Sequence, residues 1–200
     1  MKVHEDFQRN VFINCPFDDA YEFIFKAIHF TVRRCGFRLR CSKEFEDSSG
    51  IRIKNIVQLI RESRYSIHDL SRVSVDEVAR LPRFNMPLEL GICIGAIEFG
   101  DKHRKDHAYL ILESQKFRFK QFVSDLSGQD IQHHNDDPLI AIKCIRNWLS
   151  KKTPEIIPSA SIIALEYEQF CKELPMLCEL NQWRQAELTY GEYSHLVASW

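Results

Sequence analysis

The sequence of 200 residues has almost no net charge and no long apolar run. Its 27 basic and 28 acidic residues leave a formal charge of -1, whereas binding to the phosphate backbone of nucleic acids normally goes with a basic excess. No segment approaches the roughly 20 apolar residues that a membrane span needs, and the polar N-terminal segment lacks the apolar core of a signal peptide. We therefore expect a soluble cytoplasmic protein without a membrane span or an obligate nucleic-acid partner.

Paired cysteine motifs are also absent. The seven cysteines are odd in number, no two of them form a CxxC pair, and most lie in apolar segments. This pattern predicts reduced thiols rather than a disulfide framework or a structural zinc site.

Several common catalytic motifs are missing. No GxGxxG follows a predicted strand, and the chain has neither a Walker-type GxxxxGK[ST] nor a GxSxG elbow, which removes the main support for a classical dinucleotide fold, a P-loop NTPase or a serine hydrolase. His133 and His134, close to Asp130, are residue types that bind metals. Adjacent residues of a strand point to opposite faces, so we predict no metal site and no cofactor.

Strand-like and helix-like segments alternate as far as residue 152. Strands are predicted at 11–14, 37–41, 65–71 and 107–113, with a short one at Ile131, and helices at 21–36, 51–63, 87–99 and 138–152. This alternation is typical of an open, flavodoxin-like α/β sheet of parallel strands flanked by helices. Beyond residue 153 only helical patterns occur. We therefore predict an α/β domain over 1–152 and a C-terminal helical extension over 153–200, packed on that domain or on a second subunit.

Ligands of such sheets bind at the carboxyl ends of the strands, which indicates the segments 15–19, 68–72 and 113–115. Cys15 lies in the first of them, where a ligand would reach it unless it serves only as a small packing residue. Basic residues surround these segments and would either bind nucleotide phosphates or form a solvated surface. They are Arg64, Arg72, Arg80 and Arg83.

Glu89 is a lone carboxylate in the otherwise apolar segment MPLELGICIGAI, residues 86–97. Burying an unpaired carboxylate costs several kcal/mol, so two interpretations arise. In the first, Pro87 opens the helix and Glu89 caps it as the third residue. In the second, the helix dipole keeps Glu89 ionised, and it stabilises or traps an oxocarbenium-like transition state. Asp69, at the end of the third strand, would then hold a ribose hydroxyl, or else form only a turn or cap.

Gly91 and Gly95 lie on one face of the same predicted helix. A glycine inside a helix costs about 0.8 to 1 kcal/mol relative to alanine. The pair indicates a close approach of the helix backbone to the sheet or to a ligand, and packing against the sheet is the expected cause.

Three short motifs together resemble nucleoside 2-deoxyribosyltransferases. They are a strand leading into CPF (15–17), a strand ending in DLS (69–71) and a helix opening with ELG (89–91). Over residues 10–150 the same layout is similar to the related TIR-type NAD-cleaving domains. The resemblance implies that Glu89 is the catalytic carboxylate, that Asp69 helps to bind the sugar, and that Phe17 lines the sugar or base pocket.

The segment RFNMP, residues 83–87, departs from the deoxyribosyltransferase pattern of an acidic residue and a Gly-Thr element before the glutamate. It is instead similar to bacterial TIR-like proteins. That similarity implies cleavage or transfer at the N-glycosidic bond of a nucleotide with NAD as substrate, a role in antiphage defence, and a homo-oligomer or a defence-system partner. Phe17 and Phe84 would stack on a base, Arg72 or Arg83 would contact phosphate, and Cys15 and Asn85 complete the candidate substrate site. The alternative is a catalytically silent nucleotide-sensing or scaffold module.

Overall fold

The computed structural model describes residues 2–45, 50–73, 83–101 and 104–200. Its five strands form one parallel sheet in the order β2-β1-β3-β4-β5. The strands are β1 (Asn10–Asn14), β2 (Arg38–Arg40), β3 (Tyr65–Asp69), β4 (Ala108–Glu113) and β5 (Gln132–His133). This strand order confirms the predicted open α/β sheet of flavodoxin-like type.

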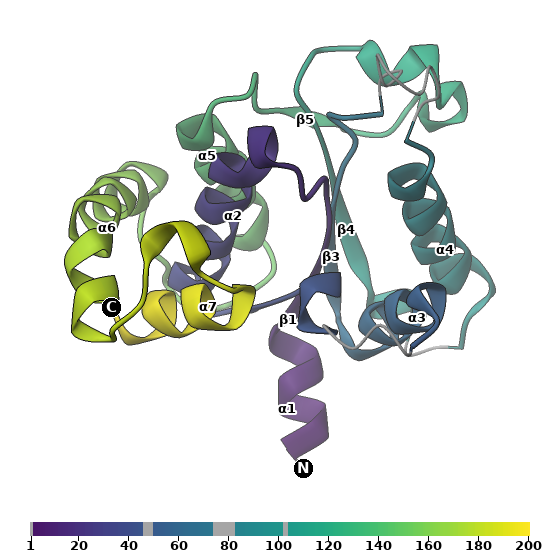
Figure 1. The fold of residues 1–200 in the computed structure, drawn as a ribbon. Coiled ribbons are helices and arrows are strands. Elements are labelled where there is room, and N and C mark those ends of the chain that lie inside the picture. Colours follow the sequence, from purple (N-terminus) through teal and green to yellow (C-terminus); the bar gives the residue numbers. More distant parts are fainter. Residues whose placement is uncertain (1, 46–49, 74–82, 102–103) are drawn as a thin grey trace.

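Helices cover both faces of the sheet (Figure 1). They are α1 (Lys2–Arg9), α2 (Glu22–Arg34), α3 (Arg52–Glu62), α4 (Asn85–Phe99), α5 (Pro138–Leu149), α6 (Ala160–Leu180) and α7 (Tyr190–Ser199). Figure 1 shows α2 and α5 on one face of the sheet and α3 and α4 on the other. Helix α1 was not predicted, because its sequence is polar and contains only two large apolar residues, Val3 and Phe7.

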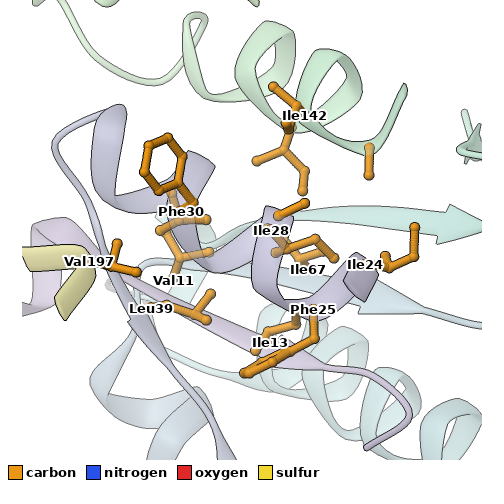
Figure 2. Close-up of a cluster of buried hydrophobic side chains, with 14 of the residues drawn as sticks. Val11, Ile13, Ile24, Phe25, Ile28, Phe30, Leu39, Ile67, Ile142 and Val197 are labelled. Carbon is orange, nitrogen blue, oxygen red and sulfur yellow. The ribbon is translucent and has the colours of Figure 1, made fainter. Parts of the chain in front are cut away.

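The largest part of the core lies between the sheet and the layer formed by α2 and α5. All five residues of β1 are buried, as expected for a central strand with helices on both faces. Figure 2 shows Ile67 of β3 beside Ile28 of α2 and Ile13 of β1 beside Phe25 of α2, with Ile142 of α5 above them in the view. This packing holds β1 and β3 side by side and fixes where both strands end.

The opposite layer contains α4, which is apolar nearly all the way round. Its inner side buries Met86, Leu90 and Cys93, but its outer side leaves Leu88 55% exposed and Phe99 92% exposed. A helix of this composition is usually buried on every side. The outer side of α4 is therefore an apolar surface that the described chain leaves open.

The expected packing of the helix glycines against the sheet is wrong. A Cβ atom added at Gly91 would meet no atom within 4 Å, and one added at Gly95 would touch only the ring of Phe99. Both glycines lie on the outer side of α4, away from the sheet. Close packing against the sheet therefore does not explain why glycine occupies these positions.

Replacing Gly91 by alanine is expected to stabilise the protein by about 0.5 to 1 kcal/mol, since alanine restricts the unfolded chain and meets no steric conflict. Chemical denaturation of wild type and variant would measure the difference. A loss of stability would show that the outer side of α4 is in contact with something in solution.

The C-terminal helices pack on the chain's own sheet domain. The ring of Phe30 in α2 lies 5.3 Å from that of Phe170 in α6 and 5.6 Å from that of Trp200. Arg34 forms a two-pronged salt bridge with Glu166 of α6. The boundary between domain and extension at residue 153 stays a prediction. Among the described helices, none is long and apolar enough to span a bilayer.

Candidate functional site

The strand order places a topological switch point between the carboxyl ends of β1 and β3, where sheets of this kind have their ligand crevice. The sheet grows from β1 toward β2 and from β3 toward β4, so the chain leaves these two neighbouring strands in opposite directions. Ligands of open α/β sheets bind at such a switch point. The segments that follow β1 and β3, and the start of α4, are therefore the parts of the fold to inspect.

Asn14, the last residue of β1, ties this strand to the first turn of α4. Its side-chain Nδ2 donates a hydrogen bond to the carbonyl oxygen of Met86 over 2.8 Å and lies 3.1 Å from Nδ1 of His68. Burial lowers the pKa of His68 to about 3, so this ring is neutral and accepts the second amide hydrogen. The buried amide thereby sets the position of α4, and with it the position of Glu89.

Glu89 is buried without being a helix cap. The helix begins at Asn85, which makes Glu89 its fifth residue, and the first turn contains no acidic residue. Only 6% of Glu89 is exposed. Within the described residues its carboxylate accepts no hydrogen bond and forms no salt bridge. The capping interpretation is therefore wrong, and the carboxyl group is free to act on a ligand.

Burial raises the pKa of Glu89 to about 7, although the nearby charge of Arg52 acts in the opposite direction. The expectation that the helix dipole keeps this group ionised is thus wrong as well, since the dipole acts mainly on the first turn. A carboxyl group with a pKa near 7 gains or loses its proton close to neutral pH. This property suits a catalytic acid, base or nucleophile.

The thiol of Cys15, the residue after β1, senses the charges of both Asp69 and Glu89. Burial raises the pKa of the Cys15 thiol well above its usual value, and the charges of Asp69 and Glu89 raise it further. Asp69 and Glu89 thus both influence the same thiol, which directly follows β1. Cys15 is 4% exposed and part of the hydrophobic core, and its thiol stays protonated.

Asp69 is fully buried, and the protein itself saturates its carboxylate. Oδ1 accepts hydrogen bonds from the backbone N–H and the hydroxyl of Ser71, while Oδ2 accepts from the hydroxyl of Tyr21 and lies 3.0 Å from Nε2 of His134. Burial acts to raise the pKa of Asp69, but the hydrogen bonds outweigh it and the pKa is lowered. Asp69 is thus an ionised anchor of the crevice, with four of its acceptor positions in use.

His134 is held by the same network. Its Nδ1 accepts a hydrogen bond from the backbone N–H of Asp136 over 3.1 Å, so the proton of the neutral ring is on Nε2, which faces Asp69. His133 is only half-buried and belongs to the edge strand β5. The two histidines thus differ in burial, and His134 is the one that contacts Asp69.

A salt bridge closes the far side of the crevice. Arg118 lies 2.9 Å from Oε1 of Glu113, at the end of β4, and also donates to the carbonyl oxygens of Leu70 and Ser71. Burial raises the pKa of Glu113 more than Arg118 lowers it. Arg118 thereby fixes the loop after β4 to the end of β3.

Two of the predicted substrate-binding residues lie at the start of α4. Phe84 is 62% exposed at the N-cap position, and Asn85 is the exposed first residue of the helix. Arg83, just before them, forms a 2.6 Å salt bridge with Asp18 from the segment after β1. This salt bridge links the two segments that border the crevice.

The remaining candidates have protein partners of their own. The ring of Phe17 packs edge-on against Phe25 at 5.4 Å, with the ammonium group of Lys43 5.1 Å from its centre. Arg72 lies 3.8 Å from Asp136 and is one-third exposed. Arg64 contacts Gln8 and the ring of Tyr65 below the amino end of β3, away from the crevice. Arg80 lies outside the described residues.

Several residues of the site were not predicted from the sequence: Asn14, Tyr21, Ser71, Arg118 and, as a partner of Asp69, His134. Asn14 immediately precedes the indicated segment 15–19, and Ser71 lies within the indicated segment 68–72, so a polar residue at a predicted strand end was an available signal. Tyr21 and Arg118 act across the fold, and no spacing in the sequence pairs them with β3.

Comparisons with family models, with curated proteins and with solved structures found no match to this chain.

Proposed function

We propose that this protein cleaves or transfers at the N-glycosidic bond of a nucleotide, and that NAD is its substrate. The observation that carries the proposal is Glu89, a buried carboxyl with a pKa of about 7 and no partner among the described residues, at the switch point of the sheet. Keeping such a group desolvated destabilises the protein. A role in chemistry accounts for that cost, whereas a structural role as a helix cap does not.

In the proposed reaction the ionised Glu89 lies beside the anomeric carbon. As the bond from this carbon to the base nitrogen breaks, the base leaves with the bonding electrons, and the carboxylate stabilises the cationic sugar or bonds to it. Water or an acceptor hydroxyl then attacks the same carbon and loses a proton. Nicotinamide leaves NAD as a neutral molecule, so this substrate requires no acid for its leaving group.

Asp69 receives a different role from the one that the resemblance implied. Because its carboxylate is saturated by Tyr21, Ser71 and His134, we assign it the positioning of the strand ends rather than a hydrogen bond to ribose. Phe84 and Asn85, exposed at the start of α4, remain the proposed contacts for the base. Arg72 and Arg83 remain those for phosphate.

Incubation of the purified protein with a panel of nucleotides and nucleosides, followed by mass spectrometry, tests this function. The expected result is release of nicotinamide from NAD at a rate that rises with pH through a midpoint near 7, because Glu89 must be ionised to act and its pKa is about 7. Measurement across protein concentrations would include any oligomer. The absence of free base or sugar product from every member of the panel would overturn the proposal.

The alternative is a silent nucleotide-sensing or scaffold module. It was supported by the interpretation of Glu89 as a helix cap, and the structure removes that support. It would still predict ligand binding without turnover in the same panel. A defence role and a homo-oligomeric state also belong to the proposal, and both rest on the resemblance to TIR-like proteins.

A further inference from the structure

The strand β4 has an open edge over its amino half. On one side β3 pairs with it from Ala108 to Leu112, whereas on the other side β5 pairs with it only at Leu112 and Glu113. Within the described residues, the side of β4 turned away from β3 therefore has no neighbouring strand over residues 108–111. Such an edge is a template for pairing with another extended segment.

The backbone groups at this open edge belong to Tyr109 and Ile111. The N–H of Ala108 donates to the carbonyl oxygen of Arg64, so Ala108 turns its backbone groups toward β3. Successive residues of a strand turn these groups to opposite sides. The N–H and carbonyl of Tyr109 and the N–H of Ile111 thus face the open edge, ahead of the point where β5 begins at Gln132.

A groove of about 460 Å³ lies beside this edge, between β4 and α5. One wall is a half-buried stripe at helical spacing, which we call the α5 stripe and which consists of Ile140, Cys144 and Trp148. At 1.5 Å per residue the stripe is about 12 Å long, close to the roughly 13 Å that four residues of extended chain cover. The groove therefore matches the open stretch of β4 in length.

The other wall of the groove is polar. The ring of Tyr109 packs with the apolar residues on the α4 side of the sheet, and its hydroxyl donates to Oε1 of Gln129 over 3.4 Å. Asp130 and Gln132 line the groove beside them. Side chains of an extended segment alternate between two faces. A strand in the groove would thus place one set of side chains on the α5 stripe and the other set among polar groups.

The charges at the groove favour an acidic occupant. Lys143 and Lys151 line it in exposed positions, and neither forms a salt bridge with a described residue. Lys152 adds a third ammonium group, 5.8 Å from the centre of the Trp148 ring. Asp130 is the one acidic residue in the lining. Two exposed residues of opposite charge precede β4 and cancel; they are Lys105 and Asp106.

From these features we infer that the groove binds an extended, acidic peptide segment of another protein, which adds to the sheet as a strand beside β4. The backbone of the segment pairs with Tyr109 and Ile111, its apolar side chains cover the α5 stripe, and its acidic side chains lie near the lysines. Backbone donors and acceptors spaced as in a sheet favour a strand over a small ligand. The groove lies away from the switch point between β1 and β3, so the inference does not require the proposed enzymatic activity.

Selection from displayed random peptides of about ten residues tests this inference. We expect the wild type to enrich peptides with alternating apolar residues and a net negative charge. Asn147→Trp fills the groove from an exposed position of α5 and should weaken binding of a selected synthetic peptide at least about tenfold. Lys143→Glu combined with Lys151→Glu should do the same by reversing the charge. Lys172→Glu, exposed on α6, is the matched control and should bind as the wild type does.

Amide hydrogen exchange distinguishes an added strand from other modes of binding. With the peptide bound, the N–H groups of Tyr109 and Ile111 should exchange at least about tenfold more slowly, because they gain hydrogen-bond partners. The N–H of Leu110, which is turned toward β3, should not change. Proline at one of two neighbouring central positions of the peptide should abolish binding, since it removes a backbone donor.

Several results would overturn the inference. If selection yields no peptide that prefers the wild type to Asn147→Trp, the lysines only guard the edge against pairing. Binding that leaves the exchange at Tyr109 and Ile111 unchanged would show that the ligand is not an added strand. If sedimentation velocity shows that the selected peptide dissociates an oligomer of the wild type, the occupant of the groove is a second copy of the chain.

Discussion

Glu89→Gln is expected to remove turnover by a factor of about 10³ or more and, at the same time, to make the protein more stable above pH 7. The loss of turnover follows because an amide cannot ionise to stabilise or trap the sugar cation, and a catalytic carboxylate typically contributes at least this factor. The gain in stability follows because glutamine has nearly the same size and carries no charge that must be desolvated.

The sign and size of the stability change follow from the pKa of Glu89. Its value is about 7 in the folded protein against an ordinary 4.5, so folding favours the protonated carboxyl. The unfolded chain ionises first as the pH rises, and between about 4.5 and 7 the wild type loses up to about 3 kcal/mol relative to the amide variant. The difference should vanish below pH 4.5 and be complete above pH 7.

Urea denaturation of both proteins at pH 4, 6 and 8, with turnover measured in parallel, tests both parts. Glu98→Gln is the matched control, because Glu98 lies on the same helix but is exposed and should change neither quantity. If the Glu89→Gln variant is more stable but turns over substrate at the wild-type rate, Glu89 is buried as described and is not a catalytic residue. Equal stability of the two proteins at pH 8 would refute the burial itself.

Asp69→Ala is expected to destabilise the protein by about 3 to 5 kcal/mol, the usual loss when one partner of a buried charged network is removed. The hydroxyl of Tyr21 and the Nε2–H of His134 would lose their buried acceptor, and Ser71 would lose the group that orders its turn. A loss of this size is a large part of the 5 to 15 kcal/mol that stabilise a typical domain.

The pH dependence of this effect is opposite to that at Glu89. The pKa of Asp69 is lowered by folding, so its contribution is fully present above the ordinary pKa of an aspartate and declines as the pH falls through the lowered folded value. Thermal melting at pH 7 and at pH 3 would show a smaller difference at the lower pH. Asp125→Ala, at an exposed aspartate, serves as the control. A change below about 1 kcal/mol at pH 7 would contradict the anchoring role.

The sheet was predictable from the sequence because short strand-like segments alternate with segments of helical periodicity. The strand β3 and the helix α3 are examples, observed at Tyr65–Asp69 and Arg52–Glu62 and predicted within two residues at each end. The start of α4 was misjudged, since Pro87 was taken as the first helical residue although the chain turns into the helix two residues earlier. Because the helix begins half a turn earlier than predicted, Glu89 is too far along it to act as a cap.

The hydrogen-bond partners of Asp69 could not be predicted from the sequence, for a different reason. The carboxylate receives hydrogen bonds from Tyr21, 48 residues earlier, and from His134, the residue after β5. Local patterns record which residues alternate and which cap, but not which of several polar side chains fills the space beside a buried charge. The sequence thus indicated Asp69 and its place at the end of a strand. Only the structure shows that protein groups occupy the acceptor positions of its carboxylate.

The hydrogen bond from Asn14 to Met86 joins residues that are 72 positions apart in the chain. Contacts of long sequence separation form late, because much chain entropy is lost before they contribute. A nascent or partly folded chain can therefore hold β1, α2 and β3 together and still lack an ordered Glu89. Under this arrangement the carboxyl of Glu89 becomes ordered only after β1 and α4 have come together.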